Sequence, residues 1–291
     1  MIDDIFKHPP TRAARERMKE EVLKTGSVAC QTVGKSIMGE DIDLYTIGNG
    51  GVRVAYFGAH HSLESITCNL LFTFIHELSR SECFSFGYDA DALLSLYTYM
   101  VVPCVNPDGI GLVYEGCSSS PIKDRQIRMS GGDFRRWQAN ARGVDLNHNY
   151  AVGFYDYKRI ESEKGITPGA TLYSGEYPES EPEVRCVSGL VRSTAPAGII
   201  SLHSQGEEIY SFPRSAAVTR IAERLSHITG YKSSIPVGTA AFGGLSDFSG
   251  ALGIPSFTLE VGRGENPLPL SDLEGIHRRL SGALAIFPTL L

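Results

Sequence analysis

The sequence lacks the features that mark membrane, exported and nucleic-acid-binding proteins. No apolar run approaches the roughly 20 residues of a membrane-spanning helix, and the first residues hold no apolar core after a basic stretch. Basic residues do not prevail, since 27 Lys and Arg stand against 33 Asp and Glu, with a formal net charge of −6. This excess of negative charge does not favour binding to polyanions such as nucleic acids. We therefore expect a cytoplasmic protein with neither a nucleic-acid partner nor a membrane partner.

Cysteine pairs are also missing. The six cysteines stand singly, with no CxxC pair and without the dense spacing of small disulfide-linked secreted domains. We expect free thiols at these positions: Cys30, Cys68, Cys83, Cys104, Cys117 and Cys186.

The chain contains no internal repeat, low-complexity tract or linker that would divide it into independent domains. With 42% hydrophobic residues it can bury a large core. Residues 11–24, between the Pro9-Pro10 pair and Gly26, have the pattern of a short amphipathic helix. We predict a helical N-terminal extension over residues 1–29 and a single catalytic domain over residues 30–291.

After residue 30, apolar runs typical of strands alternate with helical patterns, which predicts an α/β sandwich with a largely parallel or mixed sheet. The segment 115–142 is rich in Gly, Ser and Arg without a clear period, so we interpret it as a long functional loop. The predicted strands are 52–57, 198–202 and 256–261. The predicted helices are 63–78, near 180–195 and 216–229. The pattern of 93–102 predicts a helix that leads into a strand.

Polar side chains follow the first predicted strand, in the stretch GAHHSLESIT (residues 58–67). His61 and Glu64 are three residues apart at a strand end, where open α/β sheets place their ligand sites, so they form a candidate HxxE metal-ligand pair. A structural interpretation is also open, because Ser62 can cap the following helix and Glu64 suits its first turn. We interpret His60 as a neighbour of the site.

Two further candidates stand at the ends of other buried strands. His203 ends GIISLH and could be a third metal ligand, since catalytic zinc commonly takes three protein ligands, although a histidine there could also belong to the core. Glu260 lies in the apolar run SFTLEV, where a buried carboxylate needs a partner. A glutamate beside a metal-polarised water is what general-base hydrolysis requires.

Together these residues and three further motifs resemble the zinc metallocarboxypeptidases of the carboxypeptidase A type. VNPDG (105–109) is similar to the family's Asn-Pro-Asp-Gly turn, RGVDLNHN (142–149) to its substrate segment and SEPE (180–183) to a helix start. SLHSQ carries His203 and FTLEVG carries Glu260. The stretches FRRWQANARGVDLN and EVGRGENPLPL bring the chain nearest to the bacterial γ-D-glutamyl-diamino-acid peptidases, which act on cell-wall peptides.

The resemblance implies a three-layer α/β/α sandwich around a mixed, mostly parallel, twisted sheet. It implies one zinc ion on His61, Glu64 and His203, with Glu260 as catalytic base. The expected reaction is hydrolysis of a peptide amide, the γ-D-glutamyl-diaminopimelate linkage of a small peptidoglycan-derived substrate.

This chain departs from the family pattern at two places. Asn147-His148 replaces the Asn-Arg pair that binds a terminal carboxylate, and a histidine offers fewer donors than an arginine fork. Gly250 stands near the position of the family's capping tyrosine.

The expected substrate carries extra carboxylates and an extra amino group. We predict that Asn147 and His148 hold a substrate carboxylate and that Asp247 holds the amino group. Arg136 is the candidate for stabilising the tetrahedral oxygen. Arg135, Arg142 and Arg263 are further basic candidates, with Arg135 assigned to substrate binding.

Three other functions remain open on the sequence. A conventional metallocarboxypeptidase would act on α-linked C-terminal residues. A zinc-dependent deacylase would act on N-acyl amino acids. A silent binding module would keep zinc for stability, but an intact Glu260 argues against it because structural zinc needs no base.

Overall fold

The computed structural model describes residues 2–80, 89–237 and 241–291, and its centre is one mixed sheet. Eight strands of this part pair in the order β1-β2-β4-β3-β5-β8-β6-β7. The inner pairs β4-β3, β3-β5 and β5-β8 are parallel, whereas β1-β2, β2-β4 and β8-β6 are antiparallel. The strands are β1 (Val28–Lys35), β2 (Asp41–Ile47), β3 (Val52–Phe57), β4 (Tyr97–Val102), β5 (Gly198–His203), β6 (Glu208–Phe212), β7 (Lys232–Ser233) and β8 (Ser256–Glu260).

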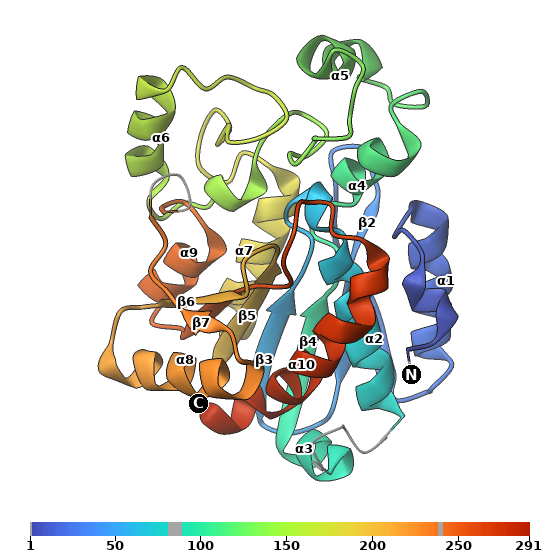
Figure 1. Cartoon of the computed structure of the whole chain (residues 1–291), viewed down its shortest axis with the longest axis vertical. Helices are drawn as coiled ribbons and strands as arrows, with labels where there is room; N and C mark the ends of the chain where they lie inside the picture. Colours follow the sequence, from blue (N-terminus) through green and yellow to red (C-terminus); the bar gives the residue numbers. More distant parts are fainter. Residues whose placement is uncertain (1, 81–88, 238–240) are drawn as a thin grey trace.

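Helices cover both faces of this sheet, with α2 and α10 in front of it and α7 behind it in Figure 1. The helices are α1 (Arg12–Leu23), α2 (Ile66–Ser79), α3 (Ala90–Leu96), α4 (Pro107–Glu115), α5 (Lys123–Ser130), α6 (Phe154–Glu163), α7 (Pro182–Thr194), α8 (Ala216–Thr229), α9 (Leu245–Ala251) and α10 (Leu273–Ile286). Short 3₁₀ turns are η1 (Asp4–Lys7), η2 (Ser62–Glu64), η3 (Leu146–His148), η5 (Leu270–Asp272) and η6 (Phe287–Leu290).

The two faces carry separate cores because side chains alternate along each strand. In β3, Val54 and Tyr56 pack with α2, α8 and α10, whereas Ala55 and Phe57 pack with α7 and α9. Strand β5 is buried along its whole length, as expected of a central parallel strand covered on both sides. The predicted three-layer sandwich around a mixed sheet is confirmed.

Most predicted elements lie where the apolar pattern put them, including β3, β5, α7 and α8. The predicted loop over 115–142 is only partly a loop, since α5 occupies Lys123–Ser130 within it. Its helix is hard to read in the sequence because only Gln126 among its residues is buried, which leaves no apolar stripe. Gly131, in the left-handed conformation, ends the helix.

The segment before residue 30 contacts the main body closely. Phe6, Met18 and Val22 belong to the core that α2 and α10 share, and the Asn69 side chain donates to the carbonyl of Phe6 at 2.7 Å. Strand β1 begins at Val28 and joins the sheet. The domain boundary at residue 29 stays a prediction.

The VNPDG motif is hydrogen-bonded to the turn between β1 and β2. The Asn106 side chain caps α4 by accepting from the backbone of Gly109 at 2.9 Å. The Asp108 carboxyl accepts from the Ser36 hydroxyl at 2.6 Å and from the backbone of Met38 at 2.8 Å. The Asn106 side chain also donates to the carbonyls of His60 and Ala139, both at 3.1 Å, so the motif has a structural role beyond the turn and the cap.

The SEPE motif contributes two buried carboxyl groups to the same region. Glu183 accepts from the backbone of Ile37 at 3.1 Å, and burial raises the pKa of Glu183 to about 8. Glu181 instead binds the guanidinium of Arg142 through both oxygens, at 2.9 Å and 3.1 Å. The motif thus ties the start of α7 to the β1–β2 turn and to the 140–149 segment.

Five of the six cysteines are free thiols, as expected, namely Cys30, Cys68, Cys104, Cys117 and Cys186, while Cys83 lies outside the described residues. Within the described ranges, every helix is too short or too polar to cross a bilayer. The cytoplasmic location stays a prediction.

Candidate active site

The candidate residues meet because β3, β5 and β8 are parallel neighbours that end at the same edge of the sheet. His203 is the last residue of β5 and Glu260 the last of β8, and the two are directly paired in register. His61 and Glu64 follow β3, within the turn that carries η2. A parallel sheet thus places residues about 200 positions apart along the chain around one point, here 61 and 260.

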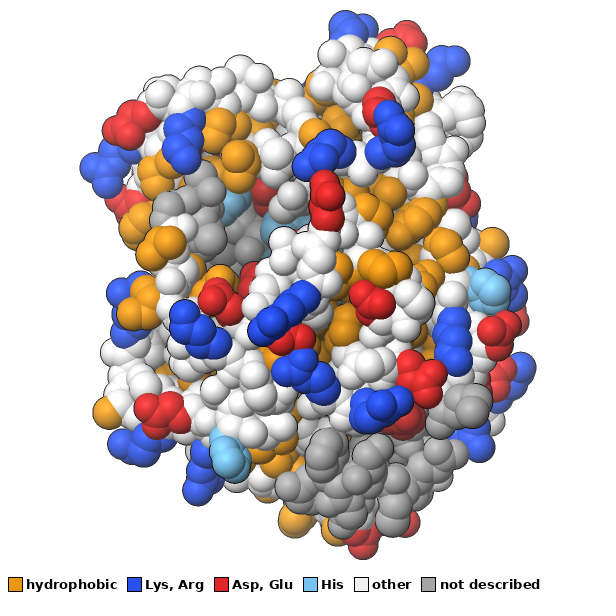
Figure 2. All heavy atoms as spheres, in the orientation of Figure 1, with side chains coloured by type: hydrophobic (Ala, Val, Ile, Leu, Met, Phe, Trp, Pro, Cys, Tyr) orange, Lys and Arg blue, Asp and Glu red, His pale blue; other side chains and the backbone are white. Residues whose placement is uncertain are grey.

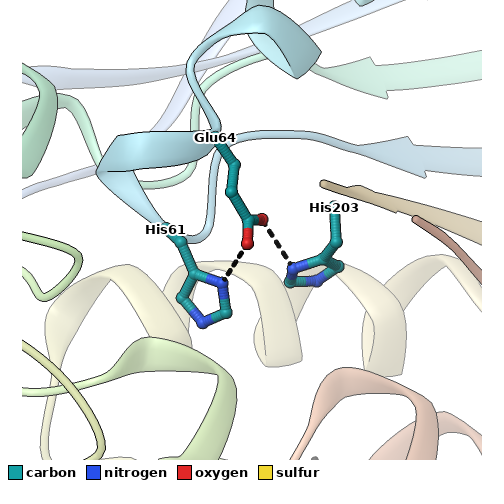
Figure 3. A group of neighbouring side chains, drawn as sticks. All are labelled: His61, Glu64 and His203. Carbon is teal, nitrogen blue, oxygen red and sulfur yellow. Dashed lines mark hydrogen bonds and ion pairs between the residues drawn. The ribbon is translucent and has the colours of Figure 1, made fainter. Parts of the chain in front are cut away.

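His61, Glu64 and His203 form a buried cluster whose potential ligand atoms all lie within 4.8 Å of one another. The Nδ1 atom of His61 is 3.0 Å from Oε1 of Glu64, and the Nδ1 atom of His203 is 2.9 Å from Oε2. Figure 3 shows both rings directing a nitrogen at the same carboxylate. Two imidazole nitrogens and one carboxylate are a donor set that suits catalytic zinc.

Asp145 contacts this cluster through the outer ring nitrogen of His61. Its Oδ1 atom lies 2.9 Å from Nε2 of His61, the nitrogen that faces away from Glu64. Although burial disfavours its ionisation, the charge of His61 lowers the pKa of Asp145. A carboxylate on the outer nitrogen fixes the ring orientation and makes the inner nitrogen a stronger ligand. The three candidate ligands and this support fit a zinc ion.

The charges of the cluster compensate one another. Burial opposes a charged imidazole, but the two carboxylates of Glu64 and Asp145 raise the pKa of His61 well above its usual value. Burial likewise opposes ionisation of Glu64, yet the neighbouring His61 and His203 lower the pKa of Glu64. Metal binding would therefore displace a proton from His61.

His60 and Ser62 flank the cluster without joining it. The Nε2 atom of His60 is 2.8 Å from the hydroxyl of Tyr150, and its ring packs on that of His203 with centroids 5.6 Å apart. The alternative in which Ser62 caps the following helix does not hold, because its hydroxyl donates to the carbonyl of Trp137. Ser62 thereby ties the 131–140 loop to the candidate ligands.

A cavity of about 210 Å³ opens beside the cluster, and Glu260 lines it together with His61, Glu64 and His203. Figure 2 shows histidine atoms recessed in a hollow on this face. Burial raises the pKa of Glu260 to about 7. A divalent cation at the cluster would lower this pKa again by direct attraction.

Three of the predicted substrate-binding residues line the cavity: Asn147, His148 and Asp247. Arg135 and Arg136 do not. The side chain of Arg135 is bound to Asp133, and that of Arg136 is 85% exposed and paired with Glu265 at 3.2 Å.

The reason lies in the loop that carries these arginines. Phe134 and Trp137 turn inward and pack edge to face, with centroids 5.5 Å apart. The two residues between them consequently face solvent. Arg142 and Arg263 are also bound elsewhere, to Glu181 and Glu207 respectively. Among the described lining residues there is neither an arginine nor a lysine.

Gly250 does not line the cavity either. It lies in α9, where a side chain would meet Phe212 and Pro213. A tyrosine of β6, Tyr210, does line the cavity, and its hydroxyl donates to Glu208 at 2.8 Å.

Sequence reasoning missed Asp145, Gln138 and Tyr210 as site residues. Asp145 stands in the motif RGVDLNHN, two residues before the Asn147-His148 pair to which the sequence assigns substrate binding. Gln138 sits in the irregular loop and lines the cavity, with its side-chain oxygen 3.3 Å from the Thr171 hydroxyl. The stretch FRRWQANARGVDLN contains Gln138 but does not single it out, and no motif contains Tyr210, so the tertiary structure identifies both as lining residues.

Comparison with known proteins gives consistent matches. The family model for zinc carboxypeptidases matches residues 20–278. The chain is 31% identical over 269 residues to "Gamma-D-glutamyl-L-diamino acid endopeptidase 1" of Lysinibacillus sphaericus, covering 88% of this chain and 65% of that protein. It is 30% identical over 287 residues to the uncharacterized protein YqgT of Bacillus subtilis (strain 168), covering 94% of this chain and 75% of that protein. The chain therefore spans somewhat less than two thirds of the first relative.

The fold also matches solved structures. The crystal structure of thrombin activatable fibrinolysis inhibitor superposes with a TM-score of 0.77 at 20% identity, covering 99% of this chain and 78% of that chain. At this identity the likeness concerns the fold.

The contact between Asp145 and His61 gives a testable prediction for zinc affinity. Asp145→Asn keeps an oxygen that accepts from the His61 Nε2–H but removes its charge, so zinc affinity should fall about 10- to 100-fold. Competition with a chelating dye measures this. Asp247→Asn is the matched control, since Asp247 lines the cavity without a hydrogen bond to the cluster. Equal zinc affinities for wild type and Asp145→Asn would contradict the assignment.

Proposed function

This chain belongs to the zinc carboxypeptidase family. We propose that it is an enzyme that hydrolyses peptide bonds and that it cleaves the γ-D-glutamyl-diaminopimelate linkage of a murein-derived peptide. The observation that carries the proposal is the buried cluster of His61, Glu64 and His203 beside Glu260, at the edge where three parallel strands end. A zinc-dependent hydrolase needs a metal-binding cluster and a general base within one cavity.

In this proposal the three ligands hold one zinc ion through two nitrogens and a carboxylate. When bound there, zinc would supply Lewis acidity for the substrate carbonyl and for the attacking water. Glu260 then takes the proton of the attacking water and returns it to the leaving amine. Its place in the cavity suits this role, because no side chain of the described part hydrogen-bonds its carboxylate.

The finer substrate assignment has two supports. One is the similarity to a relative named as a γ-D-glutamyl-L-diamino acid endopeptidase. The other is the charge of the cavity, where Asp247 supplies a carboxylate and the described lining offers no arginine for a lone C-terminal carboxylate. A conventional carboxypeptidase would be expected to hold that carboxylate with an arginine fork.

A comparison of three substrates tests the proposal. Zinc-loaded protein is incubated with L-Ala-γ-D-Glu-meso-diaminopimelate, with an α-linked peptide that has a free C-terminus, and with an N-acyl amino acid, and the products are followed by mass spectrometry. We expect release of diaminopimelate from the first at more than about 100 times the rate of the others. Faster cleavage of the α-linked peptide would indicate a conventional carboxypeptidase, and faster cleavage of the N-acyl amino acid a deacylase.

Glu260→Gln should retain zinc and lose turnover. The variant removes the base and leaves all three ligands in place, so kcat should fall by a factor of about 10² to 10⁴. Metal content by mass spectrometry and kcat on the preferred substrate check both parts. Glu223→Gln, exposed on α8 and outside the cavity, is the control. Full activity of Glu260→Gln would disprove the assignment of the base.

Two variants can decide which side chain donates a hydrogen bond to the oxygen of the tetrahedral intermediate. Arg136, the residue proposed from the sequence, would have to leave Glu265 to reach the cavity, whereas Gln138 already lines it and can donate through its amide nitrogen. We expect Gln138→Ala to lower kcat by about 10²-fold and Arg136→Ala to have a much smaller effect. The reverse order, measured at saturating substrate, would return the role to Arg136.

A further inference from the structure

The ring of His148 is held in one orientation within the cavity. It stacks on Tyr157 with centroids 3.7 Å apart and an interplanar angle of 9°. Its Nδ1 atom is 3.0 Å from the carbonyl oxygen of Phe242. Two contacts on different parts of the ring leave it little freedom to turn.

The contact with Phe242 decides which nitrogen carries the proton. A carbonyl oxygen only accepts hydrogen bonds, so the hydrogen must sit on Nδ1. Burial lowers the pKa of His148, which favours the neutral ring. In that form Nε2 carries a lone pair, and no group of the described part hydrogen-bonds it. His148 therefore offers the cavity an acceptor, whereas a carboxylate would need a donor.

Asn147 next to it offers the opposite function. Its side-chain oxygen accepts from the backbone of Leu245 at 3.3 Å, which leaves the amide NH₂ group available to donate. Both residues line the same cavity. The pair is thus complementary to a substrate group that has an accepting oxygen and a donating nitrogen side by side.

A carboxylate in the same cavity, that of Asp247, has the negative charge that would attract an ammonium group. Asp247 lines the cavity, and one of its oxygens accepts from the backbone of Gly244 at 3.2 Å, which leaves the other for a ligand. Burial raises the pKa of Asp247, while Arg214, an exposed residue outside the lining, lowers it. A cation bound at this position would favour the ionised carboxylate.

We propose that Asn147, His148 and Asp247 select a leaving amino acid that carries a second amino group next to a carboxylate. Asn147 donates to the carboxylate, Nε2 of His148 accepts from the ammonium group, and Asp247 balances its charge. The inference rests on the proposed function and replaces the expectation that His148 holds a carboxylate. The chemical class of the leaving group is then a diamino dicarboxylic acid.

The test compares two peptides that differ in one amino group. One is L-Ala-γ-D-Glu-meso-diaminopimelate, and the other carries 2-aminopimelate, which keeps the distal carboxylate and lacks the distal amine. We expect kcat/KM to fall about 10- to 100-fold without the amine, the usual value of a hydrogen bond to a charged group, and mainly through KM. Dissociation constants for both peptides are measured separately on zinc-loaded Glu260→Gln.

Two substitutions of His148 attribute the discrimination to that residue. His148→Phe keeps a ring to stack on Tyr157 and removes both nitrogens, so the preference for the amine should shrink to below about threefold. His148→Arg brings a guanidinium that also stacks on aromatic rings and binds carboxylates, so it should prefer the peptide without the amine. Arg159→Ala, exposed on α6 and outside the cavity lining, is the matched control and should keep the wild-type ratio.

The ratio between the two peptides protects the test against partial unfolding, which would reduce both rates equally. A wild type without preference for the amine overturns the inference, as does a preference that survives in both His148 variants. The binding measurement separates this failure from failure of the proposed function. If neither peptide is hydrolysed, the proposed function fails, and the ratio of dissociation constants still decides the inference. Failure of both peptides to bind also overturns it.

Discussion

The site depends on the parallel pairing of β3, β5 and β8. Parallel neighbours must end at one edge of a sheet, and here that edge receives His61 with Glu64, His203 and Glu260 from three separate parts of the chain. A shift of β8 by one residue against β5 would turn Glu260 to the opposite face, away from the cavity. The buried apolar residues on both faces of these strands fix that register, so the core determines the geometry of the chemistry.

A second layer of contacts holds the polar wall of the cavity. The 140–149 segment has little regular structure of its own, yet Asn140 and Asn149 both bind the SEPE segment through their side chains. Asn140 donates to Glu181 at 2.7 Å, and Asn149 donates to the Ser180 hydroxyl at 3.0 Å. Asp145, between them, contacts His61. The SEPE motif at the start of α7 thus also positions the segment whose residues Asn147 and His148 line the cavity.

Apolar runs and short motifs predict the four central strands β3, β4, β5 and β8 and the candidate ligands, but not β1, β2, β6 and β7. The apolar runs predicted β3 and β5, and the polar residues that end such runs proved to be neighbours in space. The side chains of Arg135 and Arg136 could not be placed that way, because their direction depends on how Phe134 and Trp137 pack. The role of His148 could not be read either, since the residue type leaves open which nitrogen holds the proton. That choice depends on a backbone carbonyl 94 residues away along the chain.

The absence of arginine and lysine from the described cavity lining also affects how a substrate arrives. Peptides with several carboxylates carry net negative charge, and this protein has a formal net charge of −6. Long-range attraction would therefore not guide a peptide of the proposed kind to the cavity, in contrast to enzymes that speed capture with a field of opposite sign. Recognition must then act at contact distance, through the lifetime of the complex, and added salt should speed encounter by screening the repulsion.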